Sequence, residues 1–381
     1  VAVGYNALAT EDAHGRNIAI GTNALTTLDA GADAYNIAIG HNAGLSVTTG
    51  TSNTLIGGLS GDALTTGFAN VAIGYQASGA ATIANNNIAI GSDALHDNVA
   101  GDRNVAIGSE ALEFMTAAST TDTYNVAVGY NAGKQVTTGI KNTLIGGLAG
   151  DALTTGEKNV AIGYNALSTE DTGSRSVAVG HDALATQNYD GLAYNIAIGY
   201  NTGGNITTGV NNTIIGGLAG DALNSGSQNV ALGTAALGSA TTSANNIAIG
   251  ADALGALTTS ARNVAIGTEA LNGAMNTGSD TYNVAVGYQA GNDVTTGTHN
   301  TLIGGLAGDA LTTGDNNIVI GYNAAASAVD VDNEITLGDA NISAFRCADQ
   351  SIAALSDGRD KSDVEESPYG LEFINKLKPV K

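Results

Sequence analysis

The sequence predicts an all-β protein, a parallel β-solenoid with about 17 residues per coil. The phrase Asn-aliphatic-Ala-aliphatic-Gly recurs in 20 copies, as in residues 70–74. Of the 19 spacings between closing glycines, 15 are equal to 17, and the others are 19, 21, 19 and 20. The residue before the closing glycine is Ile, Val or Leu in every copy. A fixed short period of this kind is typical of solenoids, in which each repeat is one coil stacked on the last.

The composition excludes several other classes. Gly is 53 of 381 residues, but Pro is only 2 and no three-residue glycine period exists, so collagen is excluded. An apolar fraction of 43% argues against disorder. A net charge of -22 argues against binding to nucleic acid or to anionic lipid. The single cysteine, Cys347, excludes an intrachain disulfide.

Membrane insertion is not predicted. The chain lacks an apolar run of the length that a membrane span needs, and no signal peptide is visible. Val1 stands in the middle of a repeat, so the chain reads as a fragment of a longer protein.

Each phrase predicts one short strand. Side chains alternate between the two faces of a strand, so Val160 and Ile162 share one face and Ala161 takes the other. We expect the aliphatic pair to line the inside of the coil. Alanine on the outer face would then allow another layer, such as a second subunit, to approach closely. The glycine supplies the turn that follows.

Two further features recur after each strand. An apolar residue, such as Leu167 or Leu153, follows the glycine by four or seven positions and is expected to form the opposing wall. Thr-Thr-Gly segments, as at residues 48–50, are expected to be a second short strand with its turn. Asn begins 17 of the 19 phrases that show this position, Ser176 and Glu334 being the exceptions. Stacked Asn amides can form a hydrogen-bonded ladder, although Asn also suits a turn.

The coils are arranged in a higher-order repeat. Residues 35–77, 124–167, 194–237 and 282–325 are near copies, and the extra residues stand mostly before them. Such insertions are expected to leave a solenoid as loops on one side. Twenty coils at the strand spacing of about 4.8 Å predict a rod of about 95 Å. A coil this narrow would leave apolar faces exposed, and association of three rods would cover them.

The repeats resemble a known family. Asn-x-Ala-Ile-Gly-x-x-Ala is similar to the head repeats of trimeric bacterial adhesins of the YadA type, over residues 1–338. This resemblance implies a left-handed parallel β-roll assembled as a homotrimeric fibre. The family's usual repeat is somewhat shorter than the period of this chain, so the match concerns the strand phrase.

The C-terminus resembles a second family. Residues 356–361 (Ser-Asp-Gly-Arg-Asp-Lys) and 370–380 are similar to the start of the endosialidase-type intramolecular chaperone domain of phage tail spikes and fibres. The resemblance implies a 20-coil shaft at 1–338, a junction at 339–355 and a truncated chaperone at 356–381. It also implies self-cleavage between Ser356 and Asp357, with Ser356 as the nucleophile and Lys361 as its basic partner.

Other constellations are read as structural. The phrase Gly-Gly-Leu-Ala-Gly-Asp, as at residues 146–151, differs in spacing from the calcium β-roll phrase, so a turn is favoured over a calcium site. No cofactor and no metal site are predicted. His41 and His181 stand directly after the closing glycine, where Tyr stands in seven other coils. This row suits packing at an interface, or stacking on sugar rings.

These observations predict a structural and adhesive shaft of a phage tail fibre, extracellular and part of the virion. Its partners would be two further copies, other phage tail proteins and a host surface glycan or outer-membrane receptor. The shaft is not expected to be an enzyme. Three alternatives stay open, namely a bacterial trimeric adhesin stalk, a tailspike depolymerase and an ice-binding solenoid suggested by the Thr-Thr pairs.

Overall fold

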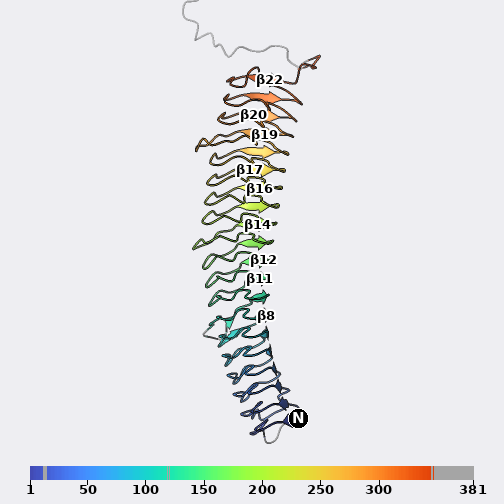
Figure 1. The fold of residues 1–381 in the computed structure, drawn as a ribbon, viewed down its shortest axis with the longest axis vertical. Helices are drawn as coiled ribbons and strands as arrows, with labels where there is room; N and C mark the ends of the chain where they lie inside the picture. Colours follow the sequence, from blue (N-terminus) through green and yellow to red (C-terminus); the bar gives the residue numbers. More distant parts are fainter. Residues whose placement is uncertain (12–14, 118, 120, 345, 347–381) are drawn as a thin grey trace, which may run out of the picture. The chain divides into compact units, whose positions relative to one another are not determined.

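The computed structural model describes residues 1–11, 15–117, 119, 121–344 and 346, and it divides the chain into two units, Val1–Ala340 and Asn341–Lys381. The described secondary structure consists of strands, without a helix. Within the first unit the coils stack in chain order, each contributing one strand to a continuous sheet (Figure 1). The parallel β-solenoid predicted from the recurring phrase is therefore confirmed.

The main sheet has 20 strands and is parallel throughout. Its strands are β1 (Ala2–Val3), β2 (Ile18–Ile20), β3 (Ile37–Ile39), β4 (Thr54–Ile56), β5 (Val71–Ile73), β6 (Ile88–Ile90), β8 (Val105–Ile107), β10 (Val126–Val128), β11 (Thr143–Ile145), β12 (Val160–Ile162), β13 (Val177–Val179), β14 (Ile196–Ile198), β15 (Thr213–Ile215), β16 (Val230–Leu232), β17 (Ile247–Ile249), β18 (Val264–Ile266), β19 (Val284–Val286), β20 (Thr301–Ile303), β21 (Ile318–Ile320) and β22 (Ile335–Leu337). Successive strands pair in register, so that Ala161 lies beside Ala178. A second, two-stranded sheet pairs β7 (Gly101–Asp102) with β9 (Thr121–Asp122).

The predicted orientation of the strands is wrong. The central residue of each main-sheet strand from β2 to β21 is buried, whereas both flanking residues, mostly Ile and Val, are half-buried or exposed. Ala161 is 0% exposed, and Ile162 is 36% exposed. The reason is the width of the coil, because leucines from the opposing wall already occupy its interior. A second row of Val and Ile pointing inward would not fit beside them.

The core keeps its volume when the central residue is larger. Leu55 replaces alanine as the central residue of β4. Near it, Gly44 and Gly61 stand four residues after their closing glycines, where other coils carry a leucine of the opposing wall. A Cβ added to Gly44 would lie 2.7 Å from Leu55 Cδ1, and one added to Gly61 would lie 2.8 Å from Leu55 Cδ2. Leu144 fills the space at Gly133 and Gly150 in the same way. A large residue at the centre of the strand is thus accompanied by glycine at the wall position, and this exchange conserves the packing density of the core.

The asparagines form a ladder, which was one of the two roles that the sequence allowed for them. The Oδ1 atom of Asn142 accepts a hydrogen bond from the backbone N–H of Asn159 at 2.9 Å. The Nδ2 atom of Asn142 donates to the carbonyl of Gly156 across the same coil, also at 2.9 Å. These amides are buried, and pairing keeps their burial from costing free energy.

The expected second strand at the Thr-Thr-Gly segments is wrong. In the described part of the chain these segments form bends, as at residues 48–50. The backbone N–H groups of Thr48 and Gly50 both donate to the carbonyl of Thr65, at 3.0 and 3.2 Å. Two donors that converge on one acceptor cannot continue the alternating pairing of a strand. The apolar residues of this wall, such as Leu153 and Leu167, are nevertheless fully buried as predicted.

Candidate functional site

An aliphatic face runs along the sheet. It consists of the two residues that flank the central residue of each main-sheet strand from β2 to β21, and we call it the aliphatic face. These residues are Ile, Val or Leu except in four strands, where the first is Thr54, Thr143, Thr213 or Thr301. Ile145, Ile162 and Ile198 on this face are 36 to 38% exposed in the single chain. Because the strands pair in register, these side chains form continuous columns. Contiguous exposed apolar surface on this scale marks a site of contact with another molecule.

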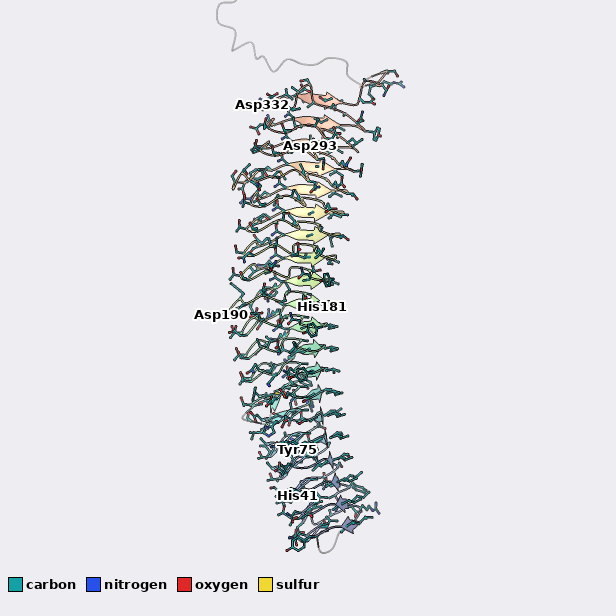
Figure 2. All side chains as sticks on the ribbon, viewed as in Figure 1. His41, Tyr75, His181, Asp190, Asp293 and Asp332 are labelled. Atoms are coloured by element: carbon teal, nitrogen blue, oxygen red, sulfur yellow. The ribbon has the colours of Figure 1, made fainter. Side chains whose placement is uncertain are left out.

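An aromatic row lies beside the aliphatic face. It occupies the position directly after the closing glycine, which the sequence analysis identified from Tyr and His residues. Tyr164, His181 and Tyr200 stack there in consecutive coils, with ring centroids 5.2 and 5.7 Å apart. Tyr164 and Tyr200 are 53 and 60% exposed. Figure 2 shows His181 on the strand side of the coil, whereas Asp190 of an insertion lies on the other side.

The four insertions share a contact that sequence reasoning missed. In each case an Arg lies over a Tyr of the coil after the insertion, at 5.4 to 5.6 Å from the ring centroid. These pairs are Arg16–Tyr35, Arg103–Tyr124, Arg175–Tyr194 and Arg262–Tyr282. The Arg and the Tyr both stand five residues before a closing glycine, so their alignment in consecutive coils was detectable from the spacing.

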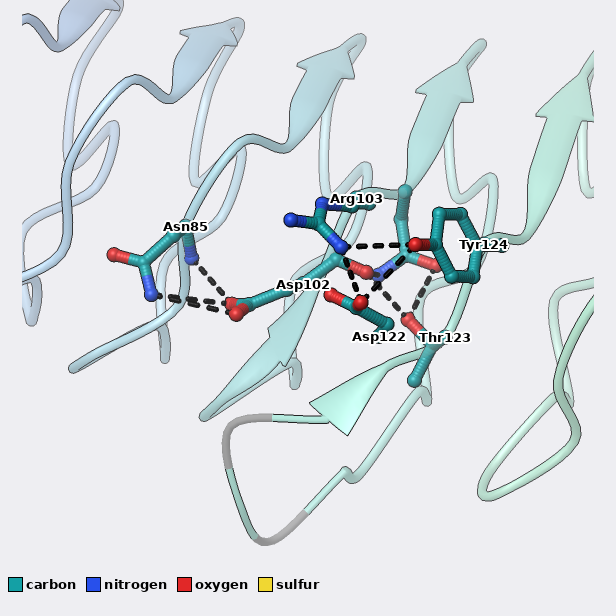
Figure 3. Close-up of polar contacts among 7 residues, drawn as sticks. Asn85, Asp102, Arg103, Asp122, Thr123 and Tyr124 are labelled. Atoms are coloured by element: carbon teal, nitrogen blue, oxygen red, sulfur yellow. Dashed lines mark hydrogen bonds and ion pairs between the residues drawn. The ribbon is translucent and has the colours of Figure 1, made fainter.

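The longest insertion shows the contact in most detail (Figure 3). Arg103 Nη1 donates to the hydroxyl of Tyr124 at 2.8 Å, and it also pairs with Asp122. The Tyr124 hydroxyl donates to Asp122 Oδ2 at 3.0 Å. Thr123 Oγ1 donates to Asn104 Oδ1 at 2.8 Å, so the insertion rejoins the asparagine ladder. These contacts connect the end of the insertion to the coil before it, which is a structural role.

A buried carboxyl group interrupts the regular core. Glu170 is 0% exposed and stands where other coils carry an apolar wall residue. Its Oε1 accepts from the Gly173 N–H at 2.7 Å and its Oε2 from Gln187 Nε2 at 2.9 Å. Gln187 Nε2 also donates to Ser176, the residue that replaces Asn in the ladder. Desolvation by burial raises the pKa of Glu170, and the bonds from Gln187 and Gly173 oppose this shift in part.

The Gly-Gly-Leu-Ala-Gly-Asp phrase has a packing role. Its third glycine, for example Gly150 at φ 55°, lies against Leu144 of the same coil. Burial raises the pKa of Asp151, and the nearby backbone N–H groups of Asp151 and Ala152 oppose this shift in part. Within the described residues, no group of three or more His, Cys, Asp and Glu side chains is arranged to hold a metal ion.

A small pocket of about 190 Å³ lies near the last coils. It is lined by Gly308, Ala310, Leu311 and residues 325–329. None of these side chains is titratable, so the pocket lining offers no acid or base. Over the described ranges the structure contains no helix of the length and hydrophobicity needed to span a bilayer.

The predicted self-cleavage residues lie outside the described residues. This applies to Ser356, Asp357 and Lys361, and also to Cys347. Their roles stay predictions from the resemblance of residues 356–380 to the chaperone domain.

Comparisons of the chain with protein-family models, with curated proteins and with solved structures found no match.

Proposed function

We propose that this chain is the structural and adhesive shaft of an extracellular attachment fibre, specifically a homotrimeric phage tail fibre. In this role the stacked coils hold a receptor-binding part of the virion away from its body and bring the shaft itself against the host surface. Other tail proteins and a host glycan or outer-membrane receptor are the proposed partners. A C-terminal chaperone that assists trimerisation completes the proposal.

The aliphatic face is the observation that carries this proposal. A monomer with this face exposed would keep columns of mostly Ile and Val in water along the main-sheet strands from β2 to β21. At about 25 cal/mol per Å² of apolar surface, covering such columns strongly favours association. Threefold association places the same face of each copy against its neighbours around one axis, so all three faces are covered in a closed assembly. The resemblance to trimeric adhesin heads supports the same arrangement.

Two alternatives share part of this evidence. A bacterial trimeric adhesin stalk would use the same shaft, and it differs by a C-terminal membrane anchor in place of the chaperone-like residues 356–380. A depolymerase would need paired carboxylates in a groove, whereas the described pocket has a lining without acidic side chains. We therefore favour a shaft that attaches over one that cleaves.

The proposal is tested by placing charges on the aliphatic face. Light scattering on the native chain should give three times the chain mass of 37.7 kDa. The triple variant Ile145→Lys, Ile162→Lys and Ile198→Lys should give the mass of one chain, because three lysines per copy would be buried without partners. Its circular dichroism should still show β-structure, since these side chains lie outside the coil core.

The matched control carries three lysines elsewhere. Thr66, Thr138 and Thr155 are exposed and lie outside the aliphatic face, so their replacement by Lys should leave the mass unchanged. A native chain that scatters as a monomer would contradict the trimer, and a triple Ile variant that stays trimeric would show that another surface forms the contact.

A further inference from the structure

In some coils the position of the aromatic row is occupied by glycine. Such a glycine has no side chain between the aromatic rings of the coils before and after it. Gly147 follows the closing glycine of its coil, with Tyr130 in the coil before and Tyr164 in the coil after. The backbone order is fixed by hydrogen bonds, because Leu148 N donates to Tyr130 O at 2.9 Å and Asn165 N donates to Gly147 O at 3.0 Å. The same arrangement recurs twice, with Gly58 between His41 and Tyr75 (Figure 2) and with Gly305 between Tyr288 and Tyr322.

Neither the backbone nor the packing requires glycine at these positions. Gly147 has no positive φ, in contrast to Gly146 at φ 132°. A Cβ on Gly147 would meet its nearest neighbour, Tyr164 Cδ2, at 3.6 Å, which is ordinary contact. A Cβ on Gly146 would instead lie 2.4 Å from the carbonyl oxygen of Gly163. Other coils carry Tyr, His, Ser, Thr or Ala at the position of Gly147, so its glycine empties a place that a side chain could fill.

One part of the row shows how a ring fits in such a place. His181 stands between Tyr164 and Tyr200, and its ring lies 5.2 and 5.7 Å from their centroids. Where glycine takes this position, as at Gly147, the backbones of the flanking residues Tyr130 and Tyr164 are two coils apart, which is about 9.6 Å at the usual strand spacing. A ring midway would lie about 4.8 Å from each, within the range of 4.5–7 Å in which rings pack on one another.

We propose that Gly58, Gly147 and Gly305, which we call the glycine slots, each receive one sugar ring of a neutral polysaccharide. This inference rests on the proposed attachment role and names the receptor class for it. The slot offers an aromatic ring on each side and the leucine that follows the glycine, and these surfaces suit the C–H face of a pyranose. The residues bearing the rings are exposed, so the slot opens to solvent in the single chain.

The neighbours of the slots favour a neutral sugar over other ring compounds. The residue after each flanking ring has a side-chain amide, in the pairs Asn42 and Gln76, Asn131 and Asn165, and Gln289 and Asn323. Amides donate and accept hydrogen bonds, as recognition of sugar hydroxyls requires. Asn165 and Gln289 already donate to Asp182 and Glu269, so a sugar hydroxyl would bond to the remaining donor and acceptor positions of these two amides. The net charge of -22 disfavours an anionic polymer. Three similar weak sites along one row also suit a repetitive polymer, which can occupy several of them together.

The test uses two neutral probes, the tetramer of N-acetylglucosamine and maltotetraose, with tetragalacturonate as the anionic comparison. Binding is measured by saturation-transfer NMR and by tyrosine fluorescence, which is not masked because the chain has no Trp. We expect at least one neutral tetramer to bind with a Kd in the millimolar range or tighter, and tetragalacturonate to bind at least tenfold more weakly.

Filling the slots gives the decisive variant. Gly58→His, Gly147→His and Gly305→His together place a ring where His181 already has one, and they should weaken binding of the neutral tetramer at least tenfold. Gly217→His is the matched control, since Gly217 stands in the same row between Tyr200 and Thr234 and so has a ring on one side only. This control should bind like the native chain.

The outcomes separate this inference from the trimer. If neither neutral tetramer binds, or if the filled variant binds as well as the native chain, the glycine slots are not sugar sites. Light scattering on the same samples shows whether the chain is trimeric. A trimer without sugar binding overturns the slots alone, whereas sugar binding by a monomer overturns the trimer alone.

Discussion

At the scale of single residues, the buried amides of the asparagine ladder are stabilised by pairing. Asn142 and its equivalents place one buried amide in most coils, and Asn142 bonds both to the next coil and across its own. Glu170 differs from these amides because it carries an ionisable carboxyl group. Most other coils have an apolar residue at the position of Glu170. Its carboxyl group is supported by Gln187 and by the N–H of Gly173. The raised pKa of Glu170 shows that these bonds do not fully offset desolvation.

This pKa shift predicts a pH dependence of stability. Because the folded pKa of Glu170 is above the unfolded pKa, protonation of Glu170 stabilises the folded state at low pH, and this contribution is lost as pH rises through the folded pKa. Glu170→Leu lacks this loss. The free energy of unfolding of the variant, minus that of the native chain, should therefore increase by on the order of 1 kcal/mol between about pH 4 and about pH 7.

Urea denaturation at several pH values measures this difference. Glu157→Gln is the control, because Glu157 lies at the surface beside Lys158 and its removal should give no comparable trend. Parallel pH curves for Glu170→Leu and the native chain would show that Glu170 has the same pKa in both states.

At the scale of elements, the coil accepts insertions because each one is closed by the same contact. Arg103 and Tyr124 occupy equivalent positions in consecutive coils, and the inserted residues leave and return between them. The strand β8 before the insertion and β10 after it remain paired in register. An insertion of this kind therefore changes one side of the coil and leaves the sheet unchanged.

Removal of the arginine should loosen the insertion without unfolding the coil. In Arg103→Ala the Tyr124 hydroxyl and Asp122 lose their cationic partner, so we expect amide hydrogen exchange at Thr121, Asp122 and Thr123 to become several-fold faster. Exchange in β8 and β10 should not change. Mass spectrometry of deuterated peptides distinguishes the two regions.

Gln228→Ala is the matched control, since Gln228 stands at the equivalent coil position with nearly the same backbone, φ 61° against 62° for Arg103. It has no insertion after it. Faster exchange across whole coils in Arg103→Ala, or equal effects in both variants, would contradict a local closing role.

At the scale of the unit Val1–Ala340, the molecule is a stack in which each coil contacts its neighbours. Stability in such a stack is close to a sum of coil terms and interfaces between neighbouring coils. Covering the aliphatic face adds a second term, which grows with the number of coils. A long stack thus presents repeated surface features, including the glycine slots, in fixed register along one row.

This organisation predicts that one whole coil can be removed. Deletion of residues 229–245 takes out one full period and places Asn246 after Gln228, where Asn229 stood. The ladder and the strand register are restored, so the chain should fold with β-structure by circular dichroism and resist proteolysis like the native chain. Deletion of residues 229–236 removes about half a coil and shifts every following residue out of register. We expect this second variant to be cleaved rapidly within the disrupted coils, and equal resistance of the two variants would contradict the stack.

The sequence alone determined the period, the place of the strands of the main sheet and the points of insertion, because all of these recur at fixed spacing. It did not determine which side of the strand faces inward. Alternation assigns Val160 and Ile162 to one face and Ala161 to the other, but both faces are apolar. Only the tertiary structure decided between them, since a coil whose interior holds a wall residue such as Leu167 has room for no more than alanine beside it. The same limit on space turned the aliphatic residues outward, where they are available to bind another copy.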